Sequence, residues 1–438
     1  MTASATRTAP APDTRPPEGL RAAAPGPPVR GGGQRIARWG GRKGSIGPLR
    51  LHQLVLLEIA AALLLCAWVA DPLLLAPVSV PAALLVVFAV VRRRRRSLPA
   101  LLHSVLALRA RRRRAESSRP AGGTEPGIAP VVECEPALRT YAFEGRDRRP
   151  VGMAGDGTYL TAVLRIEADG TALRRDRSAR PLPLALVGDA LDVDGIRLES
   201  AQIVQHTQPA PAPQLPGQSV VARNYAPLQA LAGTPALRIT WIALKLAPEL
   251  CPEAVRARGG GLTGAQRCLV RAADQLAGRL TGAGLSATVL TEQELRAAIA
   301  TSACVDPSVT ARADRDGAVA RRTRETSRTW RCDDRPHTTY WVSRWPELGG
   351  EAPMPQLVAL LTSVPALATT FALTLGHGDR QEITVTGHIR VTGSDDRELV
   401  AARHELERTA RGVKTSLVRL DRQQLPGVLA TLPLGGTR

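Results

Sequence analysis

A 41-residue stretch without basic residues constrains this chain more than any other feature. Residues 51–91 contain no lysine or arginine, although the 438-residue chain has 58 of them. A helix rises 1.5 Å per residue, so a hydrocarbon core of about 30 Å requires roughly 20 residues. The stretch is long enough for two crossings, and Asp71-Pro72 in its middle favours a reversal because proline interrupts a helix. We predict a transmembrane helical hairpin with helices at 51–70 and 73–91.

Basic residues flank this hairpin on both sides. Six of them precede it between residues 30 and 50, whereas the turn has only Asp71. The basic residues that follow the hairpin include Arg92, Arg93, Arg94, Arg95, Arg96, Arg111, Arg112, Arg113 and Arg114. The positive-inside rule therefore predicts an inner-membrane protein with both termini in the cytoplasm. A second apolar span followed by five arginines does not fit a cleaved signal peptide.

The net charge of +19 is concentrated in these flanks. Residues 1–119 hold 20 basic and five acidic side chains, whereas residues 120–438 hold 38 basic and 34 acidic ones. Arginine clusters beside a membrane attract anionic lipid at about 1 kcal/mol per residue. We therefore expect an anionic lipid partner. Nucleic acid is disfavoured because no recognition module surrounds the arginines.

Two features near the hairpin leave alternatives open. Glu58 lies about 10 Å along the first predicted helix, where a carboxylate marks contact with a partner. Alternatively, Glu58 is protonated or reaches toward His52 at the interface. Residues 98–108 are too few to span a membrane and predict an amphipathic helix at its surface, with a helical extension of the second span as the alternative.

The rest of the chain divides by composition. We predict a disordered basic N-terminus at 1–50, a basic juxtamembrane segment and linker at 92–130, and a cytoplasmic domain at 131–438. In that domain, strand patterns such as 237–246 alternate with helix patterns such as 264–280 and 394–412, the last with Ser394 as its N-cap. This alternation predicts a mixed α/β (α+β) fold. The six cysteines form no CxxC pair and predict reduced thiols.

Two short motifs are candidates for chemistry. Gly259, Gly261 and Gly264 satisfy G-x-G-x-x-G, but about a dozen residues separate them from the preceding strand, so a flexible loop and helix start are favoured over a dinucleotide site. Asp192-Val193-Asp194 resembles a metal-binding D-x-D, but the following Gly195 favours a turn. No Walker A, HExxH or GxSxG motif is present. We predict no catalytic residue, no cofactor and no metal site.

Three stretches, taken in order, resemble a known family. They are RGGGLTGAQRCL at 258–269, HTTYWVSRWP at 337–346 and LPGVLATLPLGG at 425–436, and they include Gly259, Gly260, Gly261, His337, Trp345 and Pro346. Together with the hairpin they are similar to the type VII (ESX) secretion protein EccE of actinobacteria. The resemblance implies an inner-membrane core component that assembles with EccB, EccC and EccD to export WXG100-type proteins, with EccC hydrolysing ATP. It also implies a glycosyltransferase-like fold without established activity.

Two functions from different classes follow. The first is a non-catalytic scaffold in which the hairpin packs against other subunits and the soluble domain braces the complex. The second is a membrane-anchored, glycosyltransferase-like enzyme that would use Asp192, Asp194 and the loop at Gly259. We predict the scaffold, because the family offers no catalytic residue and the two motifs are weak.

Overall fold

A computed structural model gives the structure of the chain. It describes residues 37–38, 45–46, 49–70, 75–90, 92–93, 96–117, 124–145, 148–168, 181–208, 237–316, 320–346, 354–378 and 382–436. The disorder predicted for 1–50 therefore falls almost wholly outside the described residues. Asp71, Pro72, Arg94 and Arg95 also lie outside them.

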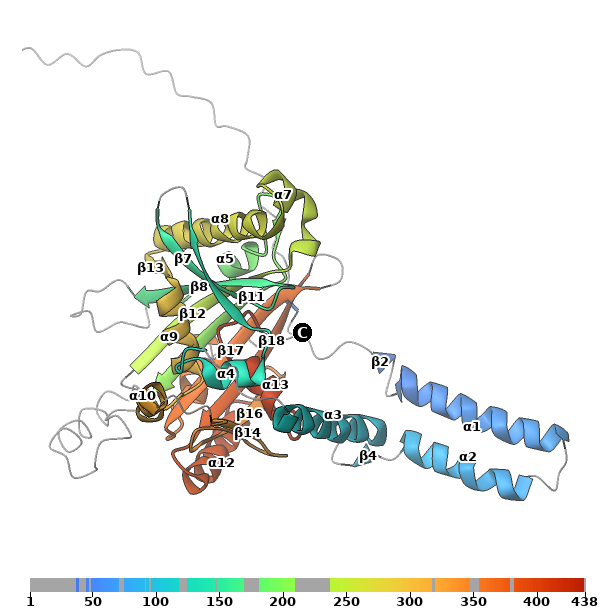
Figure 1. Cartoon of the computed structure of the whole chain (residues 1–438). Helices are drawn as coiled ribbons and strands as arrows, with labels where there is room; N and C mark the ends of the chain where they lie inside the picture. Colours follow the sequence, from blue (N-terminus) through green and yellow to red (C-terminus); the bar gives the residue numbers. More distant parts are fainter. Residues whose placement is uncertain are drawn as a thin grey trace, which may run out of the picture. The chain divides into compact units, whose positions relative to one another are not determined.

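Two helices lie where the hairpin was expected. α1 (Leu51–Ala70) and α2 (Leu75–Val90) pack against each other, and Figure 1 shows them side by side. The prediction that they are transmembrane is wrong: among the residues that the structure describes, no helix is both long and apolar enough to cross a membrane.

A third helix replaces the short surface helix predicted at 98–108. α3 (Leu98–Ser117) continues through the arginines as one 20-residue helix. Leucine, alanine and arginine all favour a helix, so the change from apolar to basic residues does not end it. Two short paired strands, β4 (Arg92–Arg93) and β5 (Arg96–Ser97), separate α3 from α2. α3 is therefore not an extension of the second helix of the hairpin.

The body is built on a large antiparallel sheet. Its strands, in spatial order, are β14 (Thr323–Glu325), β15 (Trp330–Cys332), β16 (Arg335–Arg344), β18 (Ile383–Thr392), β17 (Ala368–His377), β11 (Ser200–Gln208), β12 (Leu237–Leu246), β8 (Leu160–Ala168), β7 (Pro150–Gly155) and β6 (Arg139–Glu144). Off this path, β13 (Leu285–Val289) pairs with β8 and β19 (Ser416–Arg419) with β16, while β1 (Ala37–Arg38) runs parallel to β18.

The sheet selects the α+β alternative of the predicted mixed α/β (α+β) fold. Every pairing of the large sheet apart from β1 with β18 is antiparallel among the described strands. The distance along the chain between neighbouring strands explains this antiparallel pairing. For example, β17 ends at His377, and its partner in the sheet, Ile383, is the first residue of β18. Antiparallel neighbours need only a short turn, whereas parallel ones need a crossover of a dozen or more residues.

Helices cover both faces of this sheet (Figure 1). Successive residues of β12 alternate between two cores: Ile242 and Leu244 lie in one, and Trp241 and Ala243 in the other. The first core is completed by α5 (Leu184–Asp189), α7 (Pro252–Ala257), α8 (Gly261–Gly282), α11 (Met354–Thr362) and α12 (Asp396–Gly412). The second is completed by α4 (Ala129–Cys134), α9 (Glu292–Ser302) and α13 (Gln424–Leu429). Two further short helices are η2 (Pro248–Leu250) and α10 (Pro307–Asp316), and β2 (Ser45–Ile46) pairs with β3 (Leu49–Arg50) ahead of α1.

Local sequence signals explain where individual helices begin. α9 begins with a capping box, in which Thr291 and Glu294 satisfy each other's backbone N–H groups. The N-cap of α12 is Asp395, one residue after the predicted Ser394: the Asp395 carboxylate accepts from the Glu398 N–H at 2.8 Å, whereas Ser394 donates to the Glu398 carboxylate. An aspartate at this position also interacts favourably with the helix dipole.

Candidate functional site

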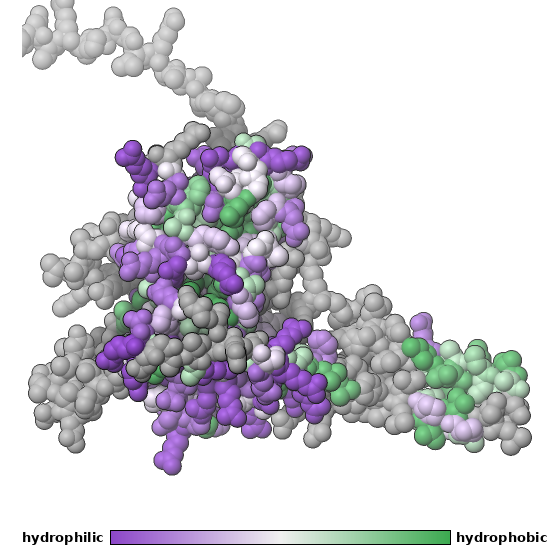
Figure 2. Space-filling model, viewed as in Figure 1, coloured by the Kyte–Doolittle hydropathy of each residue, from purple (hydrophilic) through white to green (hydrophobic). Residues whose placement is uncertain are grey.

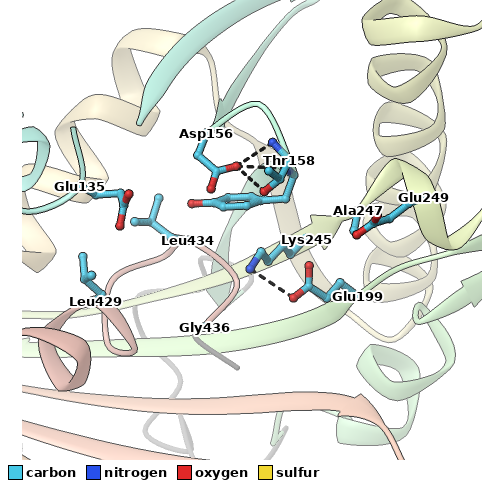
Figure 3. A pocket seen from close by; sticks show the side chains of 11 residues that line it. Glu135, Asp156, Thr158, Glu199, Lys245, Ala247, Glu249, Leu429, Leu434 and Gly436 are labelled. Atoms are coloured by element: carbon cyan, nitrogen blue, oxygen red, sulfur yellow. Dashed lines mark hydrogen bonds and ion pairs between the residues drawn. The ribbon is translucent and has the colours of Figure 1, made fainter. Parts of the chain in front are cut away.

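A pocket of about 320 Å³ lies where the C-terminal segment meets β8, β11 and β12. Figure 3 shows Lys245 and Glu199 facing each other in this pocket. Their strands place them there: Ser200 and Lys245 are opposite each other in the register of β11 and β12, and Glu199 directly precedes β11. Sequence analysis missed this pocket. One feature of the sequence could have indicated it: Lys245, one of three lysines in the chain, lies in the otherwise apolar end of the strand LRITWIALKL.

The charges of this pocket are mainly negative. Glu135, Asp156, Glu199 and Glu249 line it, and Lys245 is its single lysine. The Lys245 Nζ is 3.3 Å from Glu199 Oε1 and 4.1 Å from the centre of the Tyr159 ring. The ion pair and the cation–π contact therefore hold the ammonium group in place.

Two pocket carboxyls have shifted pKa values of opposite sign. Burial, with the nearby Asp156 charge, raises the pKa of Glu135. Burial alone would also raise the pKa of Asp156, but the hydrogen bonds that Asp156 accepts from Thr158 and Tyr159 lower it. Asp156 is therefore fixed by its own turn.

The last described residues form one wall of this pocket. Thr161 Oγ1 donates to the Leu434 carbonyl at 3.1 Å, and Ser200 Oγ donates to the Gly435 carbonyl at 2.6 Å. The Gln202 amide accepts from the Gly435 N–H at 2.9 Å and donates to the Ala430 carbonyl at 2.8 Å. The C-terminal motif LPLGG is thus bound along the sheet through its backbone.

Replacing Gly435 by alanine is expected to lower the free energy of unfolding by about 1–3 kcal/mol. Its φ is +88°, and an added Cβ would lie 2.5 Å from the Cβ of Lys245, an atom that cannot move without its strand. Urea unfolding of Gly435→Ala and of Gly412→Ala provides the measurement. A Cβ added at Gly412 would meet no atom within 4 Å, so equal losses in the two variants would contradict the steric explanation.

The glycine motif at 259–261 forms the turn between α7 and α8. All three glycines have positive φ, at +109°, +68° and +53°, and Gly260 is the N-cap of α8. A Cβ at Gly264 would lie 2.4 Å from the Val255 carbonyl oxygen, so the two helices meet closely there. The structure therefore gives these glycines a role in the helix junction.

The motif HTTYWVSRWP begins in β16 and ends just beyond it. His337 is fully buried, with its Nδ1 2.9 Å from Thr392 Oγ1 and its ring 4.9 Å from that of Trp330. Trp345 packs over Gly387, where a Cβ would lie 2.5 Å from the indole, and Pro346 follows it. These motif residues stabilise the second half of the sheet.

A buried polar cluster lies in the same region and was not predicted. Arg390 on β18 is fully buried and donates to the Ser302 carbonyl and to Thr370 Oγ1. Within the described residues, its Nε and Nη1 have no hydrogen-bond partner. Burial, with the nearby Arg390 charge, lowers the pKa of His206 to about 3 and that of His337 well below its usual value. Both histidines are therefore neutral.

The two aspartates of the D-x-D motif lie in a small hairpin. β9 (Asp192–Val193) pairs with β10 (Ile196–Arg197), and Asp194 has a φ of +50° in the turn between them. Asp194 Oδ2 is 2.8 Å from Arg271 Nη2, and Asp192 Oδ1 is 3.9 Å from His377 Nε2. Among the side chains that the structure describes, no group of three or more His, Cys, Asp or Glu could hold a metal ion.

The basic helix α3 contacts the body mainly through Arg111, while Arg112 Nε donates to the Glu325 carbonyl at 3.1 Å. Arg111 donates to both Glu325 carboxylate oxygens at 2.9 Å and to the Arg422 carbonyl at 2.8 Å. The Glu325 side chain is only 6 % exposed and also accepts from the Leu425 N–H at 3.1 Å. Arg111, which the sequence analysis assigned to lipid, is thus engaged with protein, whereas Arg112, Arg113 and Arg114 are exposed.

The structure also places Glu58 and three of the arginines that follow the hairpin. Glu58 is exposed on α1. Arg92 and Arg93 form β4, and Arg96 belongs to β5.

The chain thus has two apolar helices followed by an antiparallel α+β body, and part of this body is similar to a known family. Residues 234–342, a range that includes β12 and ends within β16, match the model of the family described as "Putative type VII ESX secretion system translocon, EccE". Over these residues the chain is similar to EccE, a type VII secretion family, which confirms the resemblance predicted from the sequence. No curated protein matches the chain.

Proposed function

We propose that the chain is a non-catalytic structural subunit of a type VII secretion complex at the cytoplasmic membrane. In this proposal it assembles with EccB, EccC and EccD and supports export of WXG100-type proteins, while a partner supplies ATP hydrolysis. The family match supports the secretion assignment. The six free cysteines, four of them buried, support a reducing, cytoplasmic location for the body.

The apolar surface of α1 and α2 is the observation on which the scaffold role rests. Leu65, Trp68 and Val69 are 62 %, 63 % and 74 % exposed. Figure 2 shows hydrophobic residues gathered on these two helices. Large exposed apolar patches mark contact sites, because water does not solvate them favourably. We assign this surface to apolar helices of the partner subunits.

The alternative, a glycosyltransferase-like enzyme, has less support. Asp194 is paired with Arg271, and Asp192 lies near His377 in a two-stranded hairpin. Two carboxylates that hold a nucleotide diphosphate through a metal would have to leave these partners. The turn therefore accounts for the D-x-D sequence without a ligand.

Substituting Leu65 by aspartate is expected to reduce the yield of the assembled complex at least about tenfold. A charge in the centre of an apolar contact must be desolvated without a partner. The measurement is copurification in mild detergent, with secretion of WXG100-type proteins as the second readout. Val400→Asp is the matched control, because Val400 is 45 % exposed on α12 of the body.

Two results would contradict the scaffold proposal. One is equal assembly of the wild type, Leu65→Asp and Val400→Asp. The other is a solitary wild-type chain that binds a nucleotide sugar and loses this binding with Asp192→Ala and Asp194→Ala. On the scaffold proposal, the double alanine variant secretes normally.

A further inference from the structure

A second pocket, of about 440 Å³, lies between α3 and the hairpin of β14 and β15. Figure 1 shows α3 beside these strands, and Arg111 and Arg112 bind Glu325 at the end of β14. Arg321 Nη1 also donates to the Ala115 carbonyl at 2.6 Å. Hydrogen bonds donated by α3 to the strands and by Arg321 to α3 therefore hold the two sides of the pocket together.

The lining of this pocket is electropositive. Four arginines and two glutamates contribute to it, which gives a formal charge of +2. Arg111 neutralises Glu325, so the free charge comes from Arg112, Arg321 and Arg324, opposed only by Glu116. Among the described residues, the Arg324 guanidinium has no hydrogen bond or ion pair, and Arg112 uses only its Nε. Guanidinium donors thus remain available for a ligand.

The floor of the pocket is apolar and uncharged. Trp330 lines it and is only 2 % exposed, and Leu425 lies nearby. Burial raises the pKa of the Cys134 thiol to about 12, so no thiolate competes with an incoming anion. An apolar floor lowers the local dielectric and strengthens the attraction between an anion and the arginines.

We propose that this pocket binds a phosphate ester, with Arg112, Arg321 and Arg324 as the guanidinium donors. The planar fork of arginine matches two oxygens of a phosphate group. A phosphate monoester has a charge of about −2 at pH 7, equal and opposite to the formal charge of the lining. A carboxylate would leave one positive charge unbalanced.

The phosphate can come from a lipid headgroup or from a soluble ester. The lipid source rests on the proposed function, because it requires the chain to lie at a membrane. The soluble source does not. Arg112 and Arg324 are exposed, so the pocket is accessible to either.

The experiment uses the full chain in mild detergent and two probes. Inorganic phosphate is titrated against chloride at matched ionic strength, with the midpoint of thermal unfolding as the readout. Phosphatidic acid is compared with phosphatidylcholine in mixed micelles by native mass spectrometry. We expect at least one phosphate probe to bind, and Arg324→Glu to weaken that binding at least about tenfold.

Arg328→Glu is the matched control. It makes the same charge change at an exposed residue in the turn of the β14–β15 hairpin, outside the pocket. Binding by this variant is expected to equal that of the wild type. Equal weakening by both substitutions, or no binding of either phosphate probe at millimolar concentration, overturns the proposal.

Further readouts separate this proposal from the scaffold role. Arg324→Glu is expected to copurify with the secretion complex as the wild type does, and its unliganded thermal unfolding midpoint is expected to be unchanged. Failure of the wild type to assemble would refute the scaffold role while leaving phosphate binding measurable. Binding of phosphatidic acid alone identifies the lipid as the source, and binding of inorganic phosphate alone identifies the soluble ester.

Discussion

Between pH 7 and pH 5, the free energy of unfolding of the body is expected to fall by at least about 4 kcal/mol. Burial lowers the pKa of His206 to about 3 and that of His388 to about 4, whereas an unfolded histidine has a pKa near 6.5. Below pH 6.5 the unfolded chain binds protons that the folded chain does not, so stability is lost as the pH falls. Each of the two contributes about 2 kcal/mol at pH 5, and His337 acts in the same direction.

No carboxylate among the described neighbours of His206 would stabilise its protonated form. Its Nδ1 is 2.9 Å from Thr370 Oγ1 on β17, its Nε2 is 3.2 Å from the Gln208 amide, and Trp241 on β12 lies beside its ring. The charged group that affects its pKa is Arg390 on β18, which repels a second positive charge. Protonation of His206 would therefore occur without a carboxylate partner.

Urea unfolding at pH 7, 6 and 5 measures this effect. His206→Gln is expected to be less stable than the wild type at pH 7 but to lose about 2 kcal/mol less between pH 7 and pH 5. His404→Gln is the control, because His404 is exposed on α12. A pH dependence that is unchanged in His206→Gln would show that other groups cause the acid sensitivity.

Elements with strong local patterns were the ones that the sequence predicted well. The helix pattern at 264–280 predicted α8, in which Leu269, Ala273, Leu276 and Leu280 are all buried. The strand pattern at 237–246 matches β12 in both bounds. These signals depend on residues close in sequence, so one sequence is enough to detect them.

The sites depend instead on contacts between distant segments. Glu199, Lys245 and Leu434 meet in the acidic pocket although they come from the residue before β11, from β12 and from the C-terminal segment. Nothing in the local sequence of any one of them specifies the other two. The arginines of α3 show the same limit, because their run predicts a basic surface but does not show that Arg111 faces a buried glutamate.

Glu325→Ala is expected to release α3 from the body, at a cost of about 3 kcal/mol to that contact. The carboxylate receives both Arg111 donors and the Leu425 N–H, and its removal leaves a partly buried guanidinium without its charge partner. α3 is rich in arginine, so limited trypsin digestion measures its release directly: we expect cleavage within residues 109–114 to become about 100-fold faster.

The double variant separates the ion pair from general destabilisation. Arg111→Met combined with Glu325→Ala removes both charges, and a coupling energy of at least about 1 kcal/mol is expected between the two substitutions. Arg113→Met is the control, because Arg113 is exposed on the same helix. If Glu325→Ala and the wild type are cleaved at the same rate, the ion pair does not hold α3. The basic helix would then be attached by its remaining contacts, such as the bond from Arg321 to the Ala115 carbonyl.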